Sequence, residues 1–127
     1  MKKAIIILLT LSLLLTLSAM AQNYYDRSGS YQGRVEKDSS GNLRFYDRSG
    51  SYQGRADKDA AGNLRFYDRS GSYQGSRSSD GRFYDRSGSY QGRTENGRFY
   101  DKTGSYQGRQ ENGRFYDKNG AYRGKKQ

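Results

Sequence analysis

Arginine and tyrosine are the residues of this chain whose types and spacing could do chemistry, because they recur together at regular intervals. A basic surface attracts polyanions through its long-range field and through counterion release. A tyrosine ring adds a flat apolar face with a hydroxyl at its edge, which suits the face of a sugar or a base. The candidate binding surface consists of four arginine–tyrosine pairs: Arg34 with Tyr46, Arg55 with Tyr67, Arg93 with Tyr100, and Arg109 with Tyr116.

Catalytic and metal-binding residues are scarce. The chain has no histidine and no cysteine, so it lacks an imidazole base, a thiol nucleophile and a His/Cys metal site. Paired carboxylates could hydrolyse glycosides, but the recurring aspartates begin turns, where capping is a sufficient structural role. The stretch from Asp26 to Gly29 also lacks the acidic spacing of an EF-hand loop. We therefore expect a protein that is not an enzyme and needs no cofactor or metal.

The candidate residues belong to a tandem repeat, Phe-Tyr-Asp-x-x-Gly-x-Tyr-x-Gly, seen for example at residues 99–108. Its Tyr-Asp pair occurs six times, at spacings of 21, 21, 17, 16 and 16 residues. A regular period of this size decides the fold class, because each unit must bury its apolar face against its neighbours. The six pairs begin at Tyr25, Tyr46, Tyr67, Tyr84, Tyr100 and Tyr116.

Each repeat carries two turn signals. Residues 85–88, Asp-Arg-Ser-Gly, suit a type I turn, since the aspartate side chain can accept from backbone N–H groups ahead of it and glycine can take the positive φ that follows. Asn96-Gly97 is typical of a two-residue type I′ hairpin turn, which needs positive φ at both residues. Asn112-Gly113 and Asp80-Gly81 predict the same turn. Each repeat therefore reads as a β-hairpin followed by a short loop.

Strand pairing outward from the turn at Asn96-Gly97 places Glu95 opposite Arg98 and Arg93 opposite Tyr100. The two 21-residue units keep the same register if each has a three-residue loop, at residues 39–41 and 60–62. In the 17-residue unit, Asp80-Gly81 would place Ser79 opposite Arg82 and require a bulge near Gly75 and Ser76.

Side chains alternate between the two faces of a strand, so the register also assigns faces. Leu43 and Leu64 lie on the same face as the phenylalanines, which indicates that this face is buried. The opposite face collects ion pairs and arginine–tyrosine stacking. For the fourth repeat, the buried face is predicted to hold Tyr90, Gly92, Thr94, Phe99 and Asp101, and the wet face Gln91, Arg93, Glu95, Arg98 and Tyr100.

Residues 1–21 have the pattern of a secretory signal peptide. Lys2 and Lys3 precede a short apolar run, and Ala-Met-Ala at residues 19–21 is an A-x-A cleavage site. The run is shorter than the roughly 20 residues that a membrane anchor needs. We expect an exported protein, periplasmic or secreted, whose mature domain comprises residues 22–127 and has no membrane span.

The composition of residues 22–127 leaves a second interpretation open. Their net charge is +8, because Lys2 and Lys3 account for the difference from the +10 of the whole chain. The only larger aliphatic side chains are Val35, Leu43 and Leu64, so phenylalanine and tyrosine must form most of the core. Loose repeats rich in glycine, serine, glutamine, arginine and tyrosine also occur in disordered segments. The constant register in units of different length favours the folded alternative.

The predicted fold is all-β, a set of tandem β-hairpin repeats with five complete hairpins and two terminal half-units. A closed ring or flower-like propeller removes the exposed strand edges that an open row would leave. The two half-units could pair with each other and close the ring, and a linear β-meander is the alternative. The predicted hairpins span residues 31–47, 52–68, 73–85, 90–101 and 106–117.

Tandem Gly-x-aromatic-Tyr-Asp-x-x-Gly-x-x-x-Gly units behind a signal peptide resemble those of small exported bacterial proteins described as five-fold β-flower proteins. The resemblance covers nearly all of residues 24–124. It implies a ring of β-hairpins and brings no established activity, so it assigns no functional residues. The six Tyr-Asp motifs of this chain depart from a five-fold arrangement and leave five-fold and six-fold closure as alternatives.

Two functions follow from these features. The first is multivalent binding of an acidic or glycan partner at the cell envelope, such as lipopolysaccharide or an acidic polysaccharide, and export disfavours nucleic acid. The second is a structural role, in which tyrosine-rich edges assemble into an extracellular or periplasmic matrix. The arginine–tyrosine surface also has a purely structural interpretation, in which the arginine stems cover the rings and the charge maintains solubility. The sequence does not define the oligomeric state.

Overall fold

A computed structural model describes residues 21–127, and this part of the chain is all-β, with no helix. Residues 1–20 of the predicted signal peptide lie outside the described residues, and Ala21 is the first residue of β1. The twelve strands are β1 (Ala21–Asp26), β2 (Tyr31–Lys37), β3 (Leu43–Asp47), β4 (Tyr52–Lys58), β5 (Leu64–Asp68), β6 (Tyr73–Arg77), β7 (Arg82–Asp85), β8 (Tyr90–Glu95), β9 (Arg98–Asp101), β10 (Tyr106–Glu111), β11 (Arg114–Asp117) and β12 (Tyr122–Lys126).

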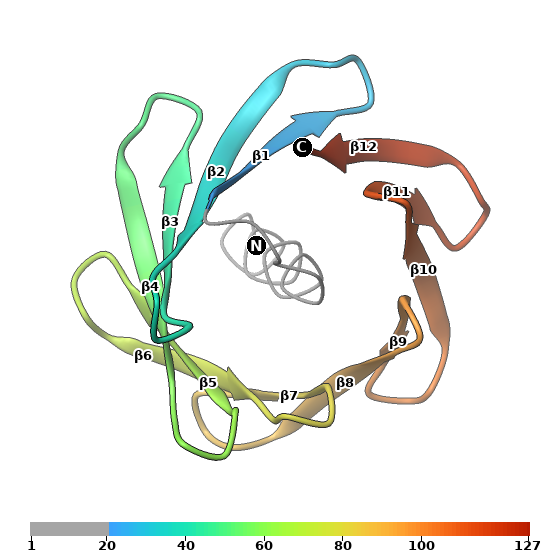
Figure 1. Cartoon of the computed structure of the whole chain (residues 1–127). Coiled ribbons are helices and arrows are strands. Elements are labelled where there is room, and N and C mark those ends of the chain that lie inside the picture. Colours follow the sequence, from blue (N-terminus) through green and yellow to red (C-terminus); the bar gives the residue numbers. More distant parts are fainter. Residues whose placement is uncertain (1–20) are drawn as a thin grey trace.

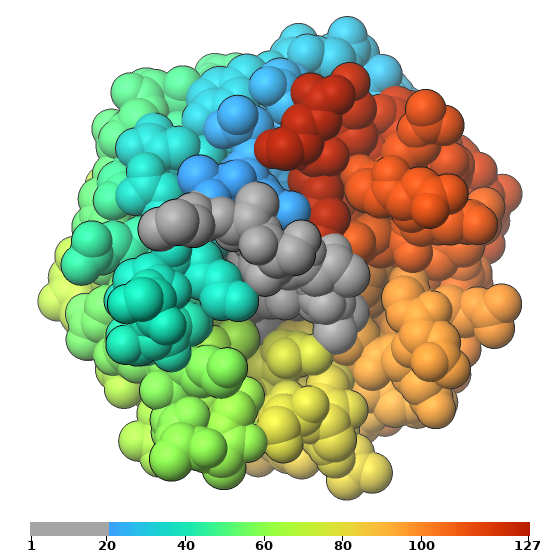
Figure 2. All heavy atoms as spheres, viewed as in Figure 1, coloured from blue at the N-terminus to red at the C-terminus, as the bar shows by residue number. Residues whose placement is uncertain are grey.

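The strands form a closed ring in which every strand pairs antiparallel with its neighbours in the chain (Figure 1). The ring closes because β1 pairs with β12, with Tyr25 opposite Lys125 and Asp26 opposite Gly124. Figure 2 shows this closure as direct contact between the blue first strands and the red last strand. The predicted pairing of the two terminal half-units is confirmed. The ring therefore has six units, five hairpins and one pair of terminal strands, and the linear meander is not adopted.

The short hairpins have the predicted turns and register. Asn96 and Gly97 have φ of 50° and 76°, and Asn112 and Gly113 have nearly the same values, as a type I′ turn requires. Glu95 lies opposite Arg98 in the ladder. The long hairpins also keep the predicted register, with Arg34 opposite Tyr46 and Arg55 opposite Tyr67.

The third hairpin, β6–β7, differs from the prediction. Its turn has three residues, 79–81, because the Ser78 amide donates to the Arg82 carbonyl at 2.8 Å and Gly81 has φ of 91°. Ser78, not Ser79, therefore faces Arg82. The predicted bulge near Gly75 and Ser76 is wrong, since this ladder runs without a break. The extra residue of the 17-residue unit is accommodated in the turn, where glycine tolerates the left-handed conformation.

A β-bulge occurs at each junction between successive units. At the junction of β7 and β8, Phe83 lies opposite Gly92 and Tyr84 opposite Tyr90, so Gln91 is the extra residue. One extra residue reverses the alternation of faces. The prediction that Tyr90 lies on the buried face is therefore wrong, because the bulge turns Tyr90 to the same face as Tyr84. The extra residues are Gln32, Gln53, Gln74, Gln91, Gln107 and Arg123.

The glycine after each bulge is required by backbone contact. Gly54 has φ of 148°, and a Cβ at this position would overlap the carbonyl oxygen of Tyr67 on the next strand. Any other residue would thus face both a strained conformation and a collision with backbone atoms. The same close approach occurs at Gly33, Gly75, Gly92, Gly108 and Gly124.

The core lies on the inner face of β1–β5. Val35 and Leu43 are 2% and 3% exposed, and Phe66 is 6% exposed. Tyr24, Ala56 and Leu64 complete this cluster, and Phe45, Phe83 and Phe115 pack against it. The prediction that Leu43 and Leu64 mark the buried face is confirmed. Phe99, on the opposite part of the ring, is only half-buried.

Candidate binding surface

The structure brings the eight predicted residues together as four stacked pairs on the outer face of the ring. In each pair the guanidinium lies over the tyrosine ring of the paired strand. The distances from the arginine Cζ to the ring centroid are 4.2 Å for Arg34 and Tyr46, and 4.4 Å for Arg55 and Tyr67, Arg93 and Tyr100, and Arg109 and Tyr116. These separations are within the range of cation–π contacts.

Each of these arginines also contacts a carboxylate on its own strand. The Arg34 Nε lies 2.9 Å from the Glu36 carboxylate, and the Arg93 Nε lies 3.6 Å from that of Glu95. Arg55 with Asp57 and Arg109 with Glu111 repeat the arrangement at 3.3 and 3.4 Å. Although Glu95 faces Arg98 in the ladder, its ion pair is with Arg93. One side of each ring is thus covered, and each covering charge is paired.

A second tyrosine completes each cluster, and sequence reasoning missed its role. The Tyr90 hydroxyl and, to a smaller extent, the Glu95 carboxylate raise the pKa of Arg93 above its usual value, because both groups favour the charged guanidinium. Tyr90 also meets Tyr84 edge to face, with ring centroids 6.0 Å apart. Five other junctions repeat this contact, in the pairs Tyr25–Tyr31, Tyr46–Tyr52, Tyr67–Tyr73, Tyr100–Tyr106 and Tyr116–Tyr122.

We call these six tyrosine pairs, with the cations between them, the tyrosine belt. The belt continues across the closure of the ring, where Lys125 Nζ lies 5.6 Å from the centroid of Tyr25. The signal for it in the sequence was a second tyrosine six residues after each Tyr-Asp tyrosine. Strict strand alternation concealed that signal, since only a bulge puts both tyrosines on one face.

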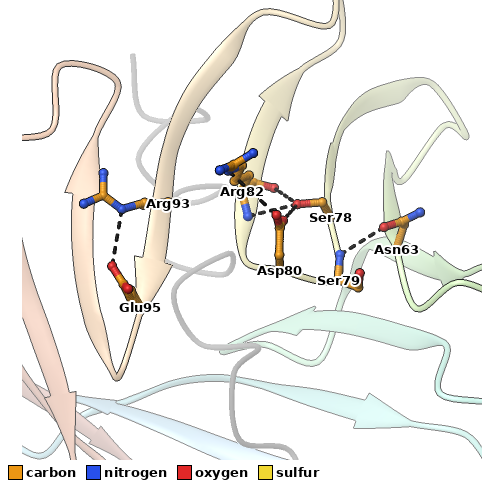
Figure 3. Close-up of polar contacts among 7 residues, drawn as sticks. All are labelled: Asn63, Ser78, Ser79, Asp80, Arg82, Arg93 and Glu95. Carbon is orange, nitrogen blue, oxygen red and sulfur yellow. Dashed lines mark hydrogen bonds and ion pairs between the residues drawn. The ribbon is translucent and has the colours of Figure 1, made fainter.

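The belt is interrupted at the third hairpin. Ser76 occupies the position opposite Tyr84 that an arginine occupies opposite Tyr46, Tyr67, Tyr100 and Tyr116. Figure 3 shows the polar groups near this interruption: the Ser78 hydroxyl contacts Asp80, and Arg93 reaches Glu95 on the neighbouring hairpin. The interruption makes one unit of the ring chemically different from the others.

The loops between units form a second repeated surface. In the fourth of these loops, at residues 85–89, the Asp85 carboxylate caps the turn: it accepts hydrogen bonds from the backbone amides of Ser87 and Ser89 at 2.9 and 3.0 Å. The Ser87 hydroxyl and the Ser89 amide are the main reasons that the pKa of Asp85 is lowered. The predicted turn cap is confirmed. Gln91, the bulge residue, donates to the same carboxylate at 3.0 Å and ties the loop to the strand.

Each capped loop carries an exposed cation directly after its aspartate. Strands alternate in direction around the ring, so all six loops project from one end, and Figure 1 shows them around its periphery. Sequence reasoning did not select these residues, although a basic residue follows the aspartate in every Tyr-Asp-x-x-Gly turn. We call them the rim cations: Arg27, Arg48, Arg69, Arg86, Lys102 and Lys118.

One arginine lies on the inner face. Arg77 is opposite Phe83 in the ladder, with its guanidinium 5.9 Å from the ring centroid. Partial burial lowers the pKa of Arg77, because it disfavours the charged form. Its Nε is buried without a hydrogen-bond partner in the described residues.

Residues 21–127 contain no helix that could cross a membrane, and their acidic groups form no cluster of three that could hold a metal ion.

Comparison with family models, with curated proteins and with solved structures finds no match to this chain. The resemblance to the β-flower proteins therefore stays a prediction, and the candidate functions depend on the geometry of the ring.

Proposed function

We propose that this protein is an exported, non-enzymatic ring that binds an acidic polysaccharide or the anionic sugars of lipopolysaccharide through its rim cations. The observation that carries the proposal is the presence of an exposed cation at the same position of all six loops, at one end of a closed ring. A repeating anionic polymer could contact several of these positions at once, so weak contacts would gain from avidity. Export depends on the signal-peptide pattern of residues 1–21.

The rim suits this role better than the arginine–tyrosine pairs first selected. The arginines of the pairs contact both a ring and a carboxylate, whereas Arg48, Arg69 and Arg86 are exposed at loop tips. The carboxylate beside each tip is held by the loop's own donors, as at Asp47, which accepts from the Ser49 and Ser51 amides at 2.9 Å. The loops are therefore fixed in shape while their cations face solvent.

Binding of the purified exported protein to polygalacturonate and to lipopolysaccharide tests the proposal, with neutral dextran and duplex DNA as comparisons. Affinity for the two anionic glycans should fall steeply between about 50 and 200 mM salt, because binding releases counterions. Equal affinity for dextran, or an affinity for the anionic glycans that does not change with salt concentration, would contradict an electrostatic contact.

A matched pair of triple variants locates the surface. Arg48, Arg69 and Arg86 are changed to serine in one variant, and Arg44, Arg98 and Arg114 in the control. All six arginines are exposed, and both variants lose the same charge, but the control positions lie near the hairpin-turn end. The rim variant should lose at least about tenfold in affinity and the control about threefold or less, since avidity depends on neighbouring contacts. Equal losses would reduce the effect to net charge.

Self-association is a second candidate, favoured by one observation. Tyr52 and Tyr73 are the most exposed large apolar side chains of the described residues, at 36% and 38%, and they occupy equivalent positions in successive units. Exposed aromatic groups can mark contacts between proteins. Sedimentation at low and high salt separates the two functions, because aromatic assembly should persist at high salt whereas polyanion binding should not.

A further inference from the structure

The third hairpin carries a tyrosine whose ring face has been left open. In five units a cation from the paired strand lies over the tyrosine of the Tyr-Asp pair, at 4.2 to 5.6 Å from the ring centroid. Tyr84 is the sixth, and Ser76 lies opposite it. Serine ends one atom beyond Cβ, so it cannot reach over the ring as arginine does. Within residues 21–127, Tyr84 alone of the six has no cation over its ring.

Neighbouring residues do not compensate for the missing arginine. Arg77 is next in the chain, but it lies on the opposite face of the strand, over Phe83. The carboxylate of the usual cluster is missing too, because Ser78 stands where Glu36, Asp57, Glu95 and Glu111 stand in the other hairpins. The Ser78 hydroxyl is bonded to Asp80, as Figure 3 shows. Both charged members of the cluster have thus been replaced by small neutral side chains.

Cations lie around the open face. Arg65 is directly opposite Ser76 on β5 and is exposed. Arg82, two residues before Tyr84, is also exposed, and its Nε is 3.8 Å from the Asp80 carboxylate. Directly opposite side chains on paired strands are close enough to share one bound molecule. These charges would repel a cationic ligand and attract an anionic one, so the open face favours an anionic ligand over a second guanidinium group.

We propose that the uncovered face of Tyr84 binds one ring of an acidic saccharide, with the apolar side of the sugar on the phenol ring and its carboxylate toward Arg65. Tyr73, the most exposed large apolar side chain of the described residues, stands three residues before Ser76, the spacing at which Tyr90 contacts Arg93 in the next hairpin. This inference rests on the proposed function for its class of ligand. It assigns a defined sugar subsite to one unit, in addition to the charge-based contact at the rim.

An NMR titration with trigalacturonate tests the subsite, with maltotriose as the neutral comparison. Trigalacturonate should shift the ring signals of Tyr84 and the amide of Ser76, and maltotriose should shift them much less. The decisive variant is Ser76→Arg, which restores the stacked pair found in the other hairpins. It should weaken binding about tenfold, the loss expected when one ring no longer stacks on an aromatic side chain.

This variant separates the subsite from general electrostatics. Ser76→Arg adds a positive charge, so an anion held by charge alone would bind more tightly to it. A gain-of-site control exists in the second hairpin: Arg55→Ser combined with Asp57→Ser uncovers Tyr67 in the same way. In the double variant, trigalacturonate should also shift the ring signals of Tyr67.

Several outcomes would overturn the inference. These are unchanged or tighter binding to Ser76→Arg, shifts confined to the rim cations, equal shifts with maltotriose, or displacement of trigalacturonate by N-acetylarginine amide. Concentration-dependent shifts without sugar would assign the Tyr84 face to a second copy of the chain instead. The two proposals fail separately: if only the rim is wrong, the rim triple variant binds normally while Ser76→Arg does not. If only the subsite is wrong, the reverse holds.

Discussion

The two long hairpins, β2–β5, and the two short hairpins, β8–β11, share an outer surface but differ inside. Both have stacked arginine–tyrosine pairs, capped loops and bulges. On the inner face, Val35 and Ala56 of the long hairpins are replaced by Thr94 and Gln110 in the short ones, which also lack the leucines. The ring geometry thus depends on the shared glycine, aspartate and tyrosine positions. Apolar burial is concentrated in the long hairpins.

The largest effect should come from the shared backbone, and it should be the same in both regions. Gly54→Ala and Gly92→Ala each place a Cβ against a carbonyl oxygen of the next strand, at φ of 148° and 141°. We expect each change to cost more than about 3 kcal/mol, since strain of about 1–3 kcal/mol adds to the overlap. Chemical denaturation measures this. A cost below about 1 kcal/mol at either site would show that the ladder can shift there.

The next prediction sharpens the difference between the interiors. Phe66 is 6% exposed and belongs to the buried cluster, whereas Phe99 is half-buried. Phe66→Ala should therefore cost about 3–5 kcal/mol, and Phe99→Ala about half as much. Thermal or urea unfolding of the two variants gives the comparison. Equal costs would mean that the short hairpins are as well packed as the long ones.

A smaller effect of opposite sign is expected at Thr94. Its side chain is 5% exposed, and its Oγ1 is buried without a hydrogen-bond partner in the described residues. Thr94→Val removes the unsatisfied hydroxyl at nearly constant volume and should stabilise the protein by about 1 kcal/mol. Val35→Thr, the reverse change in the long hairpins, should destabilise it by about 1–3 kcal/mol. A loss of stability in Thr94→Val would indicate that the hydroxyl is hydrogen-bonded.

The smallest predicted difference concerns acid. The Asn42 and Asn63 amides lower the pKa of Asp38 and Asp59 at the long turns, whereas the short turns contain no aspartate. A lowered carboxylate pKa contributes stability above the unfolded value of about 3.9, and this is lost as pH falls through the folded value. Hydrogen exchange, corrected for intrinsic rates, should therefore show greater loss of protection at Asn42 and Asn63 than at the short turns as pH falls below the unfolded carboxyl value of about 3.9. Uniform loss would locate the acid sensitivity in the six loop aspartates.

The sequence predicted the fold where local rules act one residue at a time. Asn96 and Asn112 fixed the short turns, and Asp85 fixed its loop, because positive φ and side-chain capping are local properties. Closure of the ring was also predictable, since the two terminal half-units were complementary.

What the sequence did not reveal depends on the junctions. The bulge at Gln91 reversed the face of Tyr90 and concealed the tyrosine pairs. The sequence around Gln91 does not specify a bulge by itself, because the bulge arises from the pairing of two successive hairpins. The turn at residues 79–81 was misassigned because Asp80-Gly81 suits a two-residue turn, whereas Ser78 hydrogen-bonds as the start of a longer one.

The pairing of β1 with β12 has a consequence for chain connectivity. Strands β1 and β12 are neighbours, and the Asn23 amide donates to the Gln127 carbonyl at 2.7 Å. The order of the strands around the ring therefore hardly depends on which strand comes first in the polypeptide. A circular permutant that joins the start of β1 to the end of β12 through a short linker and opens at any capped loop should build the same ring. Duplication or loss of a whole unit would instead change the circumference, so the number of repeats sets the diameter of the ring.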